Sequence, residues 1–152
     1  AASDVYKRQG YNVPIIGNAS GPCILAHLSL IEQRDVINVL HDTGRLRDLT
    51  KQSVEEIIKS FKIIKKQGYS IHRRQRNKSY VGYMRISDLT SLSVPIIKKN
   101  KNIIGAMTIR YATTALTKEK ALKNFIPVMK NAGSKIVEQM ENEKRLGKKI
   151  SF

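Results

Sequence analysis

Two neighbouring segments of the chain carry polar side chains that could hold a small charged ligand. Ser91 and Ser93 alternate with aliphatic residues in the first segment. Thr108 and Arg110 alternate in the same way in the second. Because residues two apart in a strand lie on one face, each segment predicts a polar face opposite an aliphatic one. Hydroxyl groups and a guanidinium suit a small polar ligand better than a dry core, and Arg can bind a carboxylate through two hydrogen bonds. The pattern therefore favours an organic acid.

A second feature that could bind an anion is the start of a predicted helix near residue 20. Ala19, Ser20 and Gly21 lead into an apolar run, and Pro22 stands where the first helical turn needs no N–H. The free N–H groups of such a turn favour an anion, and small side chains let a ligand approach the backbone. An ordinary capped helix start has the same pattern and is the commoner structure.

These two features would form one site if the helix covered the polar face of the strands. Its N–H groups and Arg110 would then converge on one cavity, and His72, in a neighbouring predicted strand, could add a hydrogen bond. The alternative is that the polar face is simply exposed to solvent, as in many antiparallel sheets. The spacing of the residues leaves both interpretations open.

The elements that must position these residues follow from hydrophobic periodicity and capping signals. Lys98 to Asn102 predict a hairpin turn between two strands, and Pro127 should bend or interrupt the last helix. In order, we expect an extended segment (11–16), helices (20–28, from Ser29 to about 40 and 53–67, the last ending at Gly68), a loop between the second and third helices (41–49), strands (69–72, 90–97 and 103–111) and a long helix after Thr117 whose end frays from Asn142.

Length and composition indicate one globular domain. The chain has 152 residues, of which 41% are hydrophobic, and no apolar run long enough to span a bilayer. A single cysteine, Cys23, excludes an internal disulfide, and no secretory signal is visible, so a cytoplasmic setting fits. We expect residues 1–10 to be a leader outside the fold, 11–145 to form the domain and 146–152 to be a basic tail.

The net charge of +16 suggests a polyanionic partner, although an AT-rich coding bias would also enrich lysine. The segment from Arg73 to Arg85 combines basic residues with Tyr80 and Tyr83, which is compatible with a nucleic-acid-binding module. A solvated loop has the same composition. The sequence shows no helix-turn-helix or zinc-finger pattern, so specific DNA reading by this chain is unsupported.

Enzymatic chemistry has little support. Cys23 and His27 are four residues apart and could pair as nucleophile and base, but Cys23 lies in an apolar run and is expected to be a buried hydrophobe. No common catalytic or phosphate-binding motif is present. The three histidines are dispersed, so neither a metal site nor a cofactor is expected.

The order of these elements and four local motifs resemble the C-terminal effector-binding domain of IclR-family transcriptional regulators. The resemblance extends from about Val13 to Met140. The four motifs are Asn18-Ala-Ser-Gly-Pro-Cys-Ile-Leu-Ala26, Ile63-Ile-Lys-Lys-Gln-Gly-Tyr-Ser-Ile71, Ser91-Leu-Ser-Val-Pro-Ile-Ile97 and Phe125-Ile-Pro127.

The resemblance implies an α+β, GAF-like fold, an antiparallel sheet flanked by helices, with a pocket for a small organic acid. The subgroup governing breakdown of aromatic acids is the most similar. It also implies a homodimer or tetramer that contacts DNA only through an N-terminal domain absent from this chain, with no cofactor, catalysis or membrane. Ligand-contacting positions of the family fall on Ala19, Ser20, Gly21, Ser91, Thr108 and Arg110, and an acidic one on His72. Arg110 and His72 depart from the serine and carboxylate of the family and make the pocket more cationic.

Overall fold

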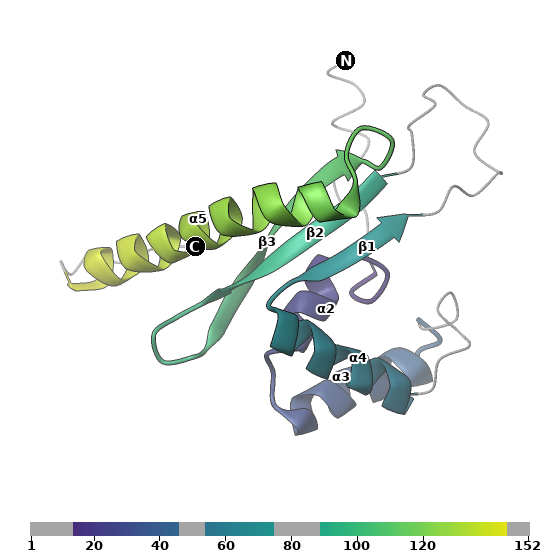
Figure 1. Cartoon of the computed structure of the whole chain (residues 1–152). Helices are drawn as coiled ribbons and strands as arrows, with labels where there is room; N and C mark the ends of the chain where they lie inside the picture. The colour runs from purple at the N-terminus through teal and green to yellow at the C-terminus, as the bar shows by residue number, and fades with distance from the viewer. Residues whose placement is uncertain (1–13, 46–53, 75–88, 146–152) are drawn as a thin grey trace, which may run out of the picture.

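The computed structural model describes residues 14–45, 54–74 and 89–145. These residues form an α+β arrangement in which helices flank a three-stranded antiparallel sheet (Figure 1). The strand order is β1-β2-β3, and the predicted fold class is confirmed. The elements are α2 (Ser20–Leu25), α3 (Leu30–Asp42), α4 (Val54–Gln67), β1 (Ser70–Arg74), β2 (Leu89–Ile97), β3 (Ile103–Ala112) and α5 (Lys118–Arg145).

The sheet separates two layers of helices. α5 crosses one face of the sheet, and α2 packs against β2 and β3 from the other, with α3 and α4 beyond it (Figure 1). Leu92 and Val94 of β2 are fully buried against Met129 of α5, which is the aliphatic side of the strand that the alternation predicts. The predicted division of the hairpin into an apolar and a polar face is therefore confirmed.

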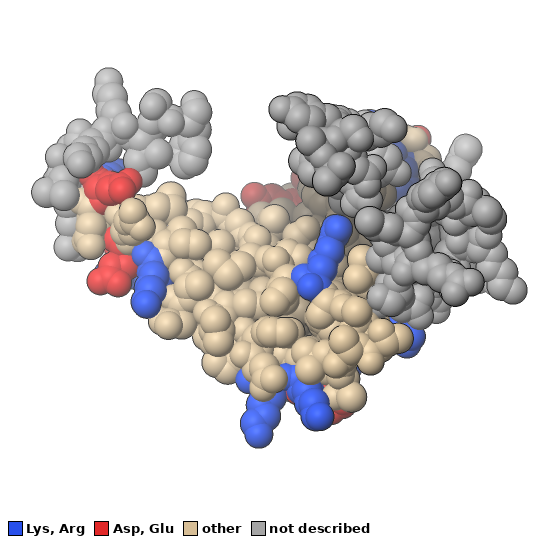
Figure 2. All heavy atoms as spheres, turned by 90° about the horizontal axis from the view of Figure 1, so that it is seen from above, with Lys and Arg blue, Asp and Glu red and all other residues tan. Residues whose placement is uncertain are grey.

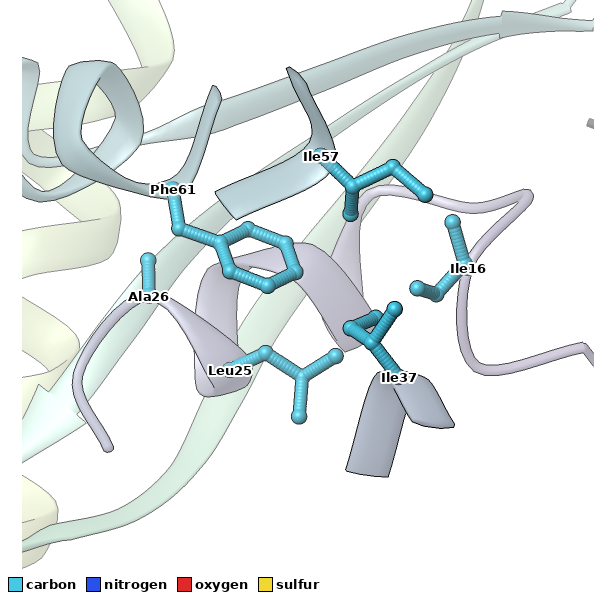
Figure 3. Packing of buried hydrophobic residues seen from close by; sticks show 6 residues of the cluster. All are labelled: Ile16, Leu25, Ala26, Ile37, Ile57 and Phe61. Carbon is cyan, nitrogen blue, oxygen red and sulfur yellow. The ribbon is translucent and has the colours of Figure 1, made fainter. Parts of the chain in front are cut away.

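A second core lies among the helices on the α2 side of the sheet. Phe61 of α4 packs between Leu25 of α2 and Ile37 of α3, and each of these side chains is at most 1% exposed. Figure 3 shows these side chains converging with Ile16 and Ile57. Because α2 supplies few large side chains, its position depends on this shared packing with α3 and α4.

The capping box predicted at the start of α3 is confirmed. The Glu32 N–H donates to the Ser29 hydroxyl over 3.3 Å, and the Glu32 carboxylate accepts the Ser29 N–H over 2.8 Å. Hydrogen bonds to the Glu32 carboxylate from the Ser29 side chain and from the Ser29 backbone hold its pKa below the usual value. Ile31, which we expected on the buried face, is instead 74% exposed.

Gln33 takes a buried place on α3 that the periodicity does not predict. Its side-chain amide donates to the Leu25 carbonyl over 3.0 Å and to the Leu28 carbonyl over 3.1 Å. The helix α2 ends at Leu25 rather than at residue 28, and the Leu25 carbonyl also accepts the Leu28 N–H over 3.1 Å. The Gln33 side chain therefore joins the end of α2 and the turn after it to α3.

Other boundaries differ in part from the predictions. Residues 15–19 form bends rather than a strand, with Gly17 at φ +128°, and residues 11–13 lie outside the described residues. The helix α5 continues through Pro127, so the predicted interruption is wrong; this proline is exposed, and its ring meets solvent. The same helix stays regular to Arg145, past the predicted fraying at Asn142.

Candidate functional site

The register of the sheet places six polar side chains on one face in two rows. Antiparallel partners directly opposite each other project to the same side of a sheet. Ser91 of β2 lies opposite His72 on β1 and opposite Arg110 on β3. Ser93 lies two residues further along β2, opposite Ser70 on β1 and Thr108 on β3. We call the first set, His72, Ser91 and Arg110, the outer row, and the second set, Ser70, Ser93 and Thr108, the inner row.

The helix α2 covers the face that carries the two rows. The Cys23 thiol lies 3.8 Å from the Ser93 carbonyl oxygen, to which it donates, and both residues are fully buried. Ala19 and Gly21, at the start of α2, are also buried, and Ser20 is half-buried. The structure therefore brings the first helix over the polar face, the arrangement on which a shared site depends.

The inner row is buried at Ser70 and Ser93 but exposed at Thr108, and two of its hydroxyls are hydrogen-bonded to each other. Ser93 is fully buried, and its hydroxyl is 2.7 Å from the Thr108 hydroxyl, in a hydrogen bond that either group can donate. Ser70 is 3% exposed, whereas Thr108 lies at the exposed margin. A ligand that reached this row would meet an existing pair of hydroxyls rather than unpaired groups.

The outer row is open and carries the positive charge. Ser91 and His72 are half-buried, and Arg110 is exposed. Among the described residues, Arg110 forms no ion pair. Its guanidinium is therefore available to an anion, and Ser91 and His72 lie beside it on the same face.

The start of α2 is not the bare helix terminus that we expected. The Asn18 side-chain oxygen accepts the Gly21 N–H and the Ser20 hydroxyl, each over 2.8 Å. Pro22 has no N–H to offer. One N–H that the prediction assigned to an anion is thus already used, and the expectation of a free first turn is wrong. Asn18 was missed as a cap although asparagine is a favoured residue at that place.

The small residue Gly21 also serves a different contact from the predicted one. A Cβ atom at Gly21 would lie 1.5 Å from the carbonyl oxygen of Ile15, so the backbone of the preceding bend occupies the space. Gly21 allows this close approach of the chain to itself. The start of α2 therefore lines the polar rows with backbone and small side chains and offers few free N–H groups to an anion.

Cys23 is not poised as a nucleophile. Burial raises the pKa of its thiol to about 11, so it is protonated at neutral pH. The His27 ring nitrogen lies 2.9 Å from the backbone oxygen of Cys23 and does not serve the sulfur as a base. The predicted role of Cys23 as a buried small hydrophobe fits this environment.

Two further features were searched in the described part of the chain. Within residues 14–45, 54–74 and 89–145, no group of three or more His, Cys, Asp or Glu side chains is arranged to hold a metal ion. None of the helices there combines the length and the apolar character needed to cross a bilayer. Of the basic segment from Arg73 to Arg85, all but the first two residues lie outside the described ranges.

Solved structures with a similar fold are transcriptional regulators or domains of them. A transcriptional regulator from Rhodococcus sp. RHA1 has a TM-score of 0.68 and 18% identity, covering 88% of this chain and 50% of that one. The C-terminal domain of the E. coli regulator KdgR has a TM-score of 0.64 and 22% identity, covering 86% and 73%. The inducer-binding domain of PobR from Acinetobacter has a TM-score of 0.60 and 10% identity, covering 86% and 71%. This chain thus spans half the length of the Rhodococcus protein.

The sequence itself places the chain within one family. Residues 1–138 match the family described as bacterial transcriptional regulator IclR C-terminal. The chain therefore belongs to the IclR family of transcriptional regulators and corresponds to their C-terminal domain.

Proposed function

We propose that this chain is the effector-sensing and oligomerisation domain of a cytoplasmic IclR-type regulator, and that its effector is a small, aromatic carboxylic acid. DNA would be read by a separate N-terminal domain of the full-length protein. The observation that carries the proposal is the outer row, in which the sheet register aligns His72, Ser91 and Arg110 on the face of the sheet against which α2 packs.

The outer row would bind the carboxylate. Arg110 can engage both carboxylate oxygens, and a charge-assisted pair of this kind is stronger than a neutral hydrogen bond. Ser91 and His72 can add a hydrogen bond each from the neighbouring strands. Arg110 is exposed, so the pair between its guanidinium and the carboxylate becomes strong only if the bound acid excludes water from the guanidinium.

The inner row and α2 would surround the rest of the effector. The hydroxyls of Ser93 and Thr108 could exchange their mutual hydrogen bond for one to a ligand hydroxyl. Ala19, Ser20 and Gly21 would form the wall on the helix side. The PobR domain, which has the same fold, has been crystallised with 3-hydroxybenzoic acid, a ligand that carries both a carboxylate and a hydroxyl.

Effector binding would act as a population shift. An acid that binds one arrangement of α2 and the sheet better than another favours that arrangement by its difference in affinity. In a homodimer or tetramer, this difference would alter the relative orientation of the subunits and so the positions of the DNA-binding domains.

Calorimetric titration of the chain with 3-hydroxybenzoate tests the site. Arg110→Gln should weaken binding by more than about tenfold, in line with the ~1.5 to 3 kcal/mol of a hydrogen bond to a charged group. Lys120→Gln, an equal charge change at an exposed position of α5, is the matched control and should leave the affinity unchanged. Equal affinities for the parent and Arg110→Gln would refute the assignment of the carboxylate to Arg110.

A further inference from the structure

The helix α4 carries its positive charge on the side that faces solvent. Ile57, Ile58 and Phe61 form its buried side. Lys59 and Lys62 are exposed on the opposite side, at the spacing of residues that share a helix face. Lys66 is exposed one turn further on. We call Lys59, Lys62 and Lys66 the lysine stripe; by the rise of an α-helix it is about 10 Å long.

No ion pair between described residues neutralises this stripe, although Glu56 lies three residues before Lys59 on α4. Between Ile57 and Arg74 the sequence contains neither Asp nor Glu. Glu55, at the start of the same helix, is already paired with Arg34 of α3, over 2.9 Å. Among the described residues, the three lysines form no ion pair. Their charges are therefore available to a partner.

A fourth cation reaches the end of the stripe from a different element. The Lys130 ammonium of α5 lies 3.2 Å from the position that a Cβ atom would have at Gly68, the residue after α4. The carbonyl groups at a helix C-terminus favour a cation at this place. Lys130 thus extends the positive line past the end of α4, on a side chain that comes around from the other face of the sheet.

The positive charge is not spread evenly over the molecule. Figure 2 shows the face seen from above the view of Figure 1, where Lys and Arg stand scattered among uncharged residues. The helix α4 lies on the lower side of Figure 1, away from that face.

We propose that the lysine stripe, together with Lys130, is a contact surface for the phosphate backbone of duplex DNA. A row of exposed ammonium groups complements a polymer that carries about one charge per 1.7 Å of its axis, and such contacts need no base sequence. The chain belongs to a family of transcriptional regulators, so DNA is the polyanion present where it works. The surface holds the domain against DNA without specifying a site, and it is independent of the effector.

The test is a salt titration of binding between the 152-residue chain and a random-sequence duplex about two helical turns long. Fluorescence anisotropy gives the affinity between about 50 and 200 mM salt, and the slope of its logarithm counts the phosphate contacts at about 0.9 each. The triple variant Lys59→Gln, Lys62→Gln, Lys66→Gln should lower that slope by about 2.7. Lys130→Gln alone should lower it by about 0.9.

A second triple variant separates the stripe from the net charge. Lys118→Gln, Lys120→Gln, Lys123→Gln removes three exposed charges from α5 and should leave the slope unchanged. Equal losses in both triple variants would overturn the proposal, and so would a parent chain that does not bind the duplex at low salt. The single variants Lys62→Gln and Lys66→Gln, each expected to lower the slope by about 0.9, give the same answer if the triple variant does not fold.

Vesicles of phosphatidylcholine and phosphatidylserine in equal parts distinguish DNA from an anionic membrane. The proposal predicts that the triple stripe variant loses more affinity for the duplex than for the vesicles, because exposed lysines attract any anionic surface to some extent. Binding to the vesicles alone, lost in the stripe variant, would assign the stripe to a lipid surface and overturn the DNA proposal.

Discussion

Replacing Gly21 by alanine separates a structural role for this residue from a role in contacting a ligand. The added Cβ would lie 1.5 Å from the Ile15 carbonyl oxygen and 2.6 Å from its carbon, both backbone atoms. To reach an ordinary contact of 3.4 Å, the carbonyl must retreat by about 1.9 Å. Ile16, the next residue, is 8% exposed and belongs to the core shared by α2, α3 and α4, so the movement disturbs that core.

The size of the effect follows from those contacts. Complete loss of the burial of Ile16 would cost about 1.5 to 3 kcal/mol and partial loss about 1 kcal/mol, and an overpacked site costs about 1 to 3 kcal/mol. We therefore expect Gly21→Ala to lower the free energy of unfolding by about 2 to 4 kcal/mol, and the melting temperature by about 10 °C. Thermal unfolding followed by circular dichroism, without any effector present, measures this change.

The matched control is Gly105→Ala in β3, where a Cβ atom meets nothing within 4 Å. This variant should melt within about 2 °C of the parent or above it, since glycine weakens a strand. If Gly21→Ala melted like Gly105→Ala and changed only effector affinity, Gly21 would be a ligand contact and the packing argument would be refuted.

Two further substitutions test the packing between elements. Gln33→Met keeps the side-chain volume but removes one donor of the Leu25 carbonyl, which retains the Leu28 N–H, and the side-chain donor of the Leu28 carbonyl. Urea unfolding should therefore show a loss of about 1 to 2 kcal/mol at an unchanged m-value, and a loss below about 0.5 kcal/mol would contradict the capping role of the amide. Gly133→Ala inside α5 should raise the free energy of unfolding by about 0.5 to 1 kcal/mol, because glycine weakens the middle of a helix. The new Cβ would lie 3.7 Å from Ile96, which is an ordinary contact. A lower melting temperature than that of the parent would show that there is no room for the Cβ beside Ile96.

The parts of the fold that could be predicted depend on short-range patterns. Ser29 and Glu32 are three residues apart, and the hydrogen bonds that make their capping box require nothing else in the chain. The alternation of Leu92 and Ser93 likewise determines which side of β2 is apolar and which is polar, although helices bury both. Such patterns hold because the interacting groups are neighbours in sequence.

The features that could not be predicted depend on contacts between separate elements. Gln33 is buried because α2 ends beside it, and nothing within α3 indicates this. The exposure of Ile31 has the same origin, since the neighbours of α3 lie on its other side. Pro127 is tolerated within α5 at a position where the ring faces solvent.

The candidate site depends partly on patterns within one strand and partly on contacts between separate elements. Alternation places Ser91 with Ser93 and Thr108 with Arg110, and these pairings could be read from each strand alone. That Ser91 lies opposite both His72 and Arg110 depends on the register of strands far apart in the chain. The hydrogen bond that closes the α2 start through Asn18 depends on the bend at residues 15–19, part of which the sequence predicts as an extended segment ending at Ile16.

The two separate cores suggest which elements an effector would influence. The outer row lies on the face covered by α2, and α2 shares its core with α3 and α4 and is joined to α3 by Gln33. The helix α5 packs in the other core, on the opposite face of the sheet. An acid that moves α2 must therefore either carry α3 and α4 with it or break the contacts of Phe61 and Gln33. Since breaking those contacts costs more free energy than moving the three helices together, we expect the response to effector to reach α4 before it reaches α5. Hydrogen exchange that changed in α5 alone on adding the acid would contradict this order.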